Sequence, residues 1–221
     1  MTSGILKPLT LLSLLLLTWP CLAALPESSA PDAAALVAGL QRPVPSHTAY
    51  TEVHFASMFD RPVVVRGELD YLGPGKLGKR VNSPYSEVTT IADGEVSVVR
   101  GERKPRSISL SQIPELDGFL RGFTALLGGD AGVLRENFEL KSNGSMDSWM
   151  LQLTPRDARL KRRIRSIDVY GSKNEARCFD VQDADGDSRV MLVERMSEAE
   201  LPKPLSPQRL NLLCRSGIAA K

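Results

Sequence analysis

Apolar and polar residues alternate through most of the chain after residue 50, which is the pattern of strands with one buried face. Residues 63–71 show it most clearly: one face holds Val63, Val65, Gly67, Leu69 and Tyr71, and the other holds Arg66, Glu68 and Asp70. Turn residues separate the runs, and Asp93-Gly94 is typical of a two-residue hairpin. The pattern predicts strands over residues 51–59, 63–72, 76–83, 85–92, 95–100, 137–142, 148–155, 164–171, 175–182 and 188–195.

Helical spacing of apolar residues interrupts these strands at two places. Pro31-Asp32 can begin a helix that ends near Leu40, and Ser111 can cap a longer helix that Gly128-Gly129 ends. Asp130 can then cap a shorter helix through Glu136. In residues 197–221 the pattern predicts only a loop with one helical turn over 210–213.

Together these elements predict an α+β fold with a strongly curved antiparallel sheet of about ten strands. So many strands favour curling into an incomplete β-barrel, and Gly67 in mid-strand is a place where the sheet can bend. The segments 32–40 and 111–136 are expected to cover its concave face as lid helices. A curved sheet under a helical lid leaves room for a cavity.

The N-terminus has the features of a secretory signal: Lys7, an apolar run over 9–19, Pro20, and small residues before a cleavage point near Ala23. Two alternatives are open. A membrane anchor would need roughly 20 apolar residues, and lipid attachment to Cys21 would require small residues where Trp19 and Pro20 stand. We therefore expect a signal peptide over 1–23, a linker over 24–31, one domain over 32–195 and a tail over 196–221. The expected location is the periplasm.

The charge balance, with 28 basic and 26 acidic residues, gives no indication of a nucleic-acid partner. Cys178 and Cys214 remain after the signal, and an even number of cysteines in an oxidising compartment favours one disulfide between them. Two separate buried thiols are the alternative.

Catalytic and metal-binding patterns are scarce. His47 and His54 are the only histidines, and neither has the spacing of a metal ligand. His54 alternates with apolar neighbours, which predicts a solvent-facing strand residue. The turn over 183–187 resembles a calcium loop, but Ser188 stands where such a loop needs glycine, so a hairpin turn with solvated carboxylates is favoured. We expect no enzyme activity, no metal and no cofactor.

Two further segments allow more than one interpretation. Residues 156–165 hold six basic side chains, which could attract anionic lipid headgroups or could simply be a solvated surface. The apolar stripe over 113–127 could be ordinary core or part of a ligand-binding box.

The order of several short motifs over residues 32–195 resembles the periplasmic lipoprotein carrier family LolA. They are Gly67-Glu68-Leu69-Asp70-Tyr71 with Pro74 and Leu77, Ser83-Pro84, Ala92-Asp93-Gly94, Leu126-Leu127-Gly128-Gly129-Asp130, Phe138, the run 149–155, the strand 164–171 and Asp185-Gly186-Asp187. In that family an arginine before the proline of the turn helps to latch the lid, whereas Gly73 stands here. Lys76, Lys79 and Arg80 are nearby cations that could substitute.

The resemblance implies a monomeric carrier without catalytic activity. It would bind the acyl chains of a lipid or lipoprotein cargo, receive them from an inner-membrane exporter and deliver them to an outer-membrane acceptor. The alternatives are a lipid-sensing or protein-interaction module on the same fold, and an enzyme acting on acyl substrates. As a carrier, the protein should line its cavity with Leu36, Leu40, Phe55, Val65, Leu69, Phe119, Phe123, Leu127, Trp149, Leu151, Leu153, Ile167 and Val169.

Overall fold

A computed structural model describes residues 30–217. The expected signal peptide over 1–23, most of the linker and the last four residues of the tail lie outside this range. The helices are α1 (Ala33–Gly39), α2 (Pro114–Gly128), α3 (Ala131–Asn137), α4 (Ala158–Lys161), α5 (Pro207–Ser216) and the short 3-10 helices η1 (Leu110–Gln112) and η2 (Glu194–Glu198). The strands are β1 (Ser46–Phe55), β2 (Val63–Gly73), β3 (Lys76–Ser83), β4 (Glu87–Ala92), β5 (Glu95–Arg100), β6 (Arg106–Ser109), β7 (Phe138–Ser145), β8 (Ser148–Pro155), β9 (Ile164–Ser172), β10 (Glu175–Asp183) and β11 (Ser188–Val193).

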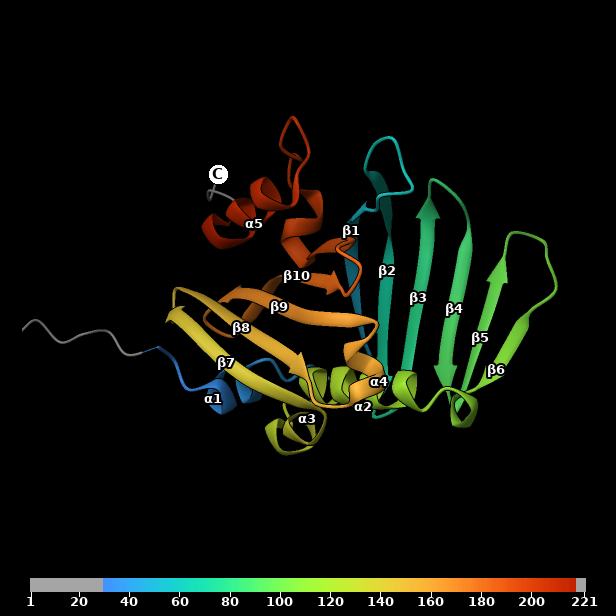
Figure 1. Cartoon of the computed structure of the whole chain (residues 1–221), viewed down its shortest axis with the longest axis horizontal. Coiled ribbons are helices and arrows are strands. Elements are labelled where there is room, and N and C mark those ends of the chain that lie inside the picture. Colours follow the sequence, from blue (N-terminus) through green and yellow to red (C-terminus); the bar gives the residue numbers. More distant parts are fainter. Residues whose placement is uncertain (1–29, 218–221) are drawn as a thin grey trace, which may run out of the picture.

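The strands form one antiparallel sheet in the order β6-β5-β4-β3-β2-β1-β11-β10-β9-β8-β7, so β6 and β7 are its two open edges. Figure 1 shows that β2 to β6 stand upright while β7 to β10 run across them, which gives the sheet its strong curvature. This confirms the predicted α+β fold with an incomplete barrel. The one strand that the sequence did not predict is β6, which is only four residues long and shows no clear alternation.

Gly67, where the sequence predicts that the sheet can bend, lies at the closest approach of β2 to β3. A Cβ atom at this position would come 1.8 Å from the backbone oxygen of Arg80 on β3, so only glycine allows the two strands to approach so closely. The register between β2 and β3 also shifts between Arg66 and Gly67. The Tyr50 ring of β1 packs over the same position.

Helices α1, α2 and α3 cover the concave face. Asp32 and Asp130 cap α1 and α3 by accepting hydrogen bonds from Ala35 and Val133, as expected. The prediction that Ser111 caps the longest helix is wrong, because Ser111 lies in η1 and α2 begins at Pro114. Proline suits the first helical position, where its missing N–H costs no hydrogen bond.

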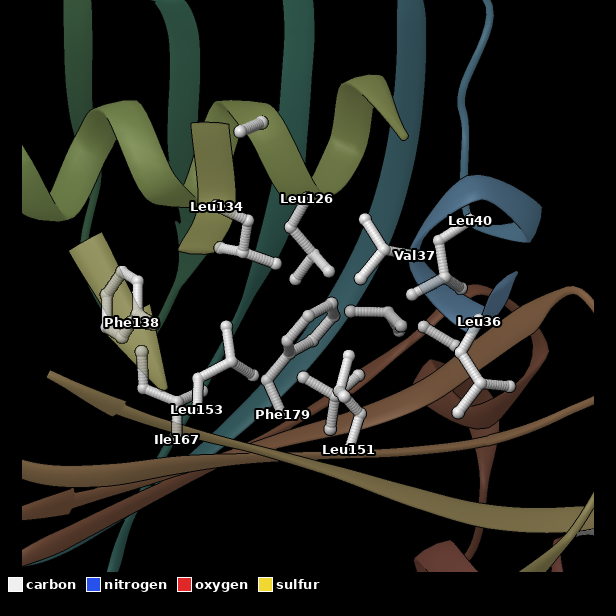
Figure 2. Packing of buried hydrophobic residues seen from close by; sticks show 14 of the residues in the cluster. Leu36, Val37, Leu40, Leu126, Leu134, Phe138, Leu151, Leu153, Ile167 and Phe179 are labelled. Atoms are coloured by element: carbon white, nitrogen blue, oxygen red, sulfur yellow. The ribbon is translucent and has the colours of Figure 1, made fainter. Parts of the chain in front are cut away.

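The main core lies between these helices and the inner face of the sheet. Figure 2 shows Leu126 and Leu134 from the lid side and Leu151, Leu153 and Phe179 from the strands meeting in one packed layer. Leu134, Leu151 and Leu153 are almost completely buried. Burying each such side chain stabilises the fold by about 1.5–3 kcal/mol.

A second core lies on the outer, convex face of the sheet. Figure 1 shows α5 on the opposite side of β7 to β10 from α1 and α3. Val53, Leu192 and Leu210 are fully buried there, and a disulfide joins Cys178 of β10 to Cys214 of α5. The tail is therefore more ordered than its sequence predicts: α5 has ten residues and begins at a cap in which Ser206 accepts a hydrogen bond from Arg209.

Candidate functional site

A cavity of about 860 Å³ lies between the inner face of the sheet and α2. Its volume falls in the range of about 300–1,000 Å³ that is typical of ligand pockets. The α2 side contributes a row of apolar side chains because α2 presents one apolar stripe to the sheet. The sheet contributes apolar residues from β2, β3, β4, β9, β10 and β11, including Leu69, Leu77, Ile91, Ile167, Val181 and Met191.

Three aromatic rings form the most apolar part of this cavity. Phe119 and Phe123 are one helical turn apart on α2, and their rings stack with centroids 6.2 Å apart. The Phe123 ring meets Phe179 of β10 edge to face at 5.8 Å. Phe119 and Phe123 remain half-buried although they point to the inside of the fold. A preformed apolar surface of this kind can bind hydrocarbon without first unpacking the core.

The opposite wall is polar. Glu52 of β1 is 5% exposed, and its Oε2 accepts a hydrogen bond from Nζ of Lys79 at 2.6 Å. His54 Nε2 lies 3.0 Å from the same oxygen. Burial alone raises the pKa of Glu52, but contact with His54 and the charge of Lys79 outweigh it and hold the pKa at about 2, below its ordinary value of 4.5. The cavity therefore carries an ionised carboxylate at neutral pH.

The position of His54 differs from the one that the sequence predicts. Its side chain is 28% exposed and points to the concave face beside Glu52, whereas the sequence predicts a solvent-facing position. The alternation places His54 on the same face as Glu52, and Lys79 of β3 reaches the Glu52 carboxylate on that face.

Charged side chains surround the rim of the cavity. Arg42 pairs with Glu194 at 3.3 Å, and Arg189 pairs with Asp183 at 2.7 Å. Arg162 and Arg163 also line the cavity from the loop after α4 and are exposed. The apolar interior thus ends in a charged border where a bound chain would meet solvent.

None of the three cations proposed as substitutes for the latch pairs with the lid. Lys76 pairs with Asp93 at 3.6 Å, Lys79 with Glu52 at 2.6 Å and Arg80 with Glu68 at 2.7 Å, so all three ion pairs stay within the strands and the β4–β5 turn. The lid is held at its C-terminal end instead. There the backbone N–H of Arg42 donates to the carbonyl of Leu127 at 2.8 Å.

The structure distributes the predicted cavity residues over three places. Six of them line the cavity: Leu40, Leu69, Phe119, Phe123, Leu127 and Ile167. Six others are buried in the core next to it and do not line it: Leu36, Val65, Trp149, Leu151, Leu153 and Val169. Phe55 lies on the outer face of the sheet and packs against the second core, because it shares its face of β1 with Val53.

Sequence reasoning missed the polar wall and several apolar residues. Glu52 and Lys79 could not be found from alternation alone, since each is a charged residue at an inward-facing position of its strand. Phe179 and Met191 sit in recognisable strands, and the remaining signal for them was their register against Val169 and Glu52. Register is set by the folded sheet rather than by either strand alone.

Within residues 30–217 no group of three or more histidine, cysteine or acidic side chains is arranged to hold a metal ion. In the same range no helix is long and apolar enough to cross a membrane.

Three solved structures illustrate the range of similar folds. A LolA superfamily protein from Nitrosomonas europaea has 13% identity and a TM-score of 0.43 over 77% of this chain and 93% of that one. A domain named for outer membrane lipoprotein sorting from Vibrio parahaemolyticus has 11% identity and a TM-score of 0.43 over 83% of this chain and 97% of that one. A chain of the MucA/MucB complex of Pseudomonas aeruginosa has 11% identity and a TM-score of 0.37 over 81% of this chain and 62% of that one.

Identities and TM-scores this low say nothing about the function of this chain. A comparison with curated proteins found no match. A protein family described as "Outer membrane lipoprotein carrier protein LolA-like" matches residues 23–216, which is most of the 221-residue sequence. The chain therefore belongs to this LolA-like family.

Proposed function

We propose that this protein is a periplasmic carrier that holds the acyl chains of a lipid or of a lipid-modified protein in its cavity. The observation that carries the proposal is the apolar cavity of about 860 Å³ between α2 and the sheet, with the Phe119, Phe123 and Phe179 rings on its wall. Family membership supports a binding role rather than catalysis.

The hydrophobic effect supplies enough free energy for such binding. Transfer of an acyl chain from water gains about 0.8 kcal/mol per methylene, so a chain of about 16 carbons gains about 12 kcal/mol before ordering costs. A carrier must also release its cargo, and an acceptor membrane offers the same hydrocarbon environment. The cavity therefore has to compete with a bilayer, not with water.

Movement of α2 offers a route for entry and release. The carbonyl of Leu127 accepts a hydrogen bond from the N–H of Arg42, which ties the C-terminal end of α2 to the segment after α1. At the other end, the Asp117–Arg121 ion pair lies within α2 itself and does not tie it to the sheet. We infer that the first turns of α2 swing away while its C-terminal end stays in place.

The address and the partners form part of the same proposal. A cleaved signal would release the protein into the periplasm, an inner-membrane exporter would load it and an outer-membrane acceptor would unload it. We expect the carrier to act as a monomer. Sequencing the N-terminus of the mature protein tests the cleavage directly, because a retained segment or a lipid on Cys21 would leave the protein tethered.

Replacement of Phe123 by Asp tests the cavity. Phe123→Asp places a charge among the aromatic rings, and we expect it to weaken binding of a fluorescent fatty acid to the delipidated protein at least about tenfold. Leu212→Asp is the matched control, since Leu212 is 66% exposed on α5, away from the cavity. Circular dichroism checks that both variants fold. If Phe123→Asp bound fatty acid as tightly as Leu212→Asp, the cavity would not be the lipid site.

A transfer assay separates a carrier from a lipid-sensing module. Donor vesicles of phosphatidylcholine that contain labelled fatty acid are mixed with unlabelled acceptor vesicles and with wild-type protein. The rate at which the label reaches the acceptor vesicles is then measured. A carrier speeds transfer in proportion to its concentration, whereas a sensor binds lipid and leaves the transfer rate unchanged. Mass spectrometry of lipids that co-purify with the protein identifies the natural cargo class.

A further inference from the structure

Three connections of the sheet come together at one of its ends. In an antiparallel meander every second connection lies on the same side, so the loops β1–β2 (56–62), β3–β4 (84–86) and β5–β6 (101–105) share one end. Figure 1 shows these three loops at the top of the upright strands, away from α2. We call them the loop end.

Apolar side chains protrude from the loop end. Met58 is 80% exposed and Phe59 is 44% exposed at the tip of the β1–β2 loop. Tyr85 of the β3–β4 loop is 38% exposed. The base of the first loop is held by hydrogen bonds from Ser57 N–H to Asp187 Oδ1 and from Phe59 N–H to the carbonyl of Ala56. The turn of the β1–β2 loop is thus held in place, and it presents Met58 and Phe59 to solvent.

Cations gather beside these tips. A hollow of about 240 Å³ on the β5–β6 hairpin is lined by Arg100, Arg103, Lys104 and Arg106 together with Val98 and Glu87. Glu87 is paired with Arg100, which also lies over the Tyr85 ring. Within the described residues, Arg103, Lys104 and Arg106 make no ion pair and no side-chain hydrogen bond. Of the residues that line the hollow only Glu87 is acidic, so the lining carries an excess of positive charge.

We propose that the loop end is a docking surface for a membrane that contains anionic phospholipids. The hollow on the β5–β6 hairpin receives a phosphate-bearing headgroup, and Met58, Phe59 and Tyr85 enter the interfacial layer beside it. Cationic side chains next to exposed apolar and aromatic tips are what such an interface attracts. This surface lies outside the cavity, so the inference does not depend on what the cavity holds.

The other basic segment, residues 156–165, is less suited to this role. Arg156 donates to the carbonyls of Arg135 and Phe138, and Arg162 and Arg165 donate to the carbonyls of Ala158 and Ala184. Its two large apolar side chains, Leu160 and Ile164, are both buried. Basic side chains without exposed apolar neighbours are typical of a solvated surface.

The loop end is also close to the cavity wall. Glu87 of the hollow and Thr89 of the cavity follow each other on the inner face of β4. Two residues along a strand span about 7 Å. A bilayer docked at the loop end would therefore lie near the strands that line the cavity.

Vesicle sedimentation tests the proposal on the full mature chain. Wild-type protein is expected to bind vesicles of phosphatidylcholine with about one-third phosphatidylglycerol, and to bind pure phosphatidylcholine far less. The double variant Arg103→Gln/Lys104→Gln should weaken binding about thirty-fold, from about 1 kcal/mol for each charge. Phe59→Ser should weaken it on the order of tenfold through lost apolar burial.

The matched control is Arg121→Gln/Lys141→Gln, which removes two exposed cations from α2 and β7 and should leave vesicle binding unchanged. Raising the salt from about 0.1 M to about 1 M should also weaken wild-type binding, because screening then acts within about 3 Å. Equal binding to both kinds of vesicle, or an effect of the control as large as that of Arg103→Gln/Lys104→Gln, would overturn the proposal. So would unchanged binding by Phe59→Ser, since the surface would then attract any polyanion.

Discussion

Replacement of Glu52 by Gln isolates the contribution of the polar wall to stability. Gln keeps the shape of the side chain but removes the charge that Lys79 and His54 face at 2.6 and 3.0 Å. Glu52 is almost fully buried, so the loss is only weakly screened by solvent. We expect Glu52→Gln to be less stable than the wild type at neutral pH.

The pKa of Glu52 gives the magnitude and the pH range. A folded-state pKa of about 2 against an ordinary value of 4.5 corresponds to about 3 kcal/mol in favour of the folded state. Because the folded pKa is the lower one, this contribution is complete above the unfolded pKa of 4.5 and is lost as the pH falls toward 2. The wild type should therefore lose stability over this range, and Glu52→Gln should lose about 3 kcal/mol less.

Urea unfolding at a series of pH values, followed by far-ultraviolet circular dichroism, measures both quantities. Glu68→Gln is the control, because Glu68 also pairs with a strand cation, Arg80 at 2.7 Å, but both of these side chains are 48% exposed. An exposed pair contributes less than about 1 kcal/mol. Equal effects of the two substitutions at neutral pH, or an unchanged acid dependence in Glu52→Gln, would show that the buried ion pair does not stabilise the fold.

Three further substitutions have effects that follow from the packing. Gly171→Ala should lower the unfolding free energy by about 1–3 kcal/mol in urea titration, since the new Cβ would come 2.1 Å from the Trp149 ring and 2.5 Å from the Glu175 carbonyl. Gly75→Ala is the comparison: nothing lies within 4 Å of its Cβ, so it tests whether a positive φ alone has a comparable effect. Leu151→Ala should cost about 2–5 kcal/mol because Leu151 is fully buried, and a smaller loss than in the half-buried Leu127→Ala would contradict the placement of the core. Cys214→Ser should cost about 4 kcal/mol by opening a loop with a sequence separation of 36, and reduction of the wild type should produce the same drop in thermal stability.

The sequence could predict the inner face of the sheet because that face obeys simple alternation. Leu151 and Leu153 of β8 and Ile167 and Val169 of β9 were expected to point inward, and they pair with one another across the two strands. Their periodicity survives because one side of β8 and β9 bears mostly polar residues. The same reasoning identified Phe119 and Phe123 from helical spacing.

The reasoning failed for Phe55 because β1 is buried on both faces. Tyr50 packs into the inner core, whereas Val53 and Phe55 pack under the outer cluster that η2 and α5 complete. In such a strand an apolar residue can be buried on either face, so alternation alone cannot decide which face of the strand points to the inner core. Recognising the tail as a packed helix would have resolved it, but α5 is short and its apolar stripe is narrow.

The sequence also could not predict which inward-facing apolar residues pack in the core and which line the cavity. The physical reason bears on function. Trp149 and Phe123 are both large and inward-facing, yet Trp149 is 1% exposed whereas Phe123 is half-buried. Gly171 leaves room for the Trp149 ring against β9, and its indole N–H donates to the carbonyl of Lys173 at 2.9 Å, so this side chain has a complete set of partners. Phe123 meets the Phe119 and Phe179 rings at the edge of the cavity and stays half-buried, and a residue with unfilled contacts is the one that a ligand can stabilise. Binding should therefore concentrate on side chains whose packing the fold leaves incomplete, and hydrophobic patterning does not distinguish these from the residues whose packing is complete.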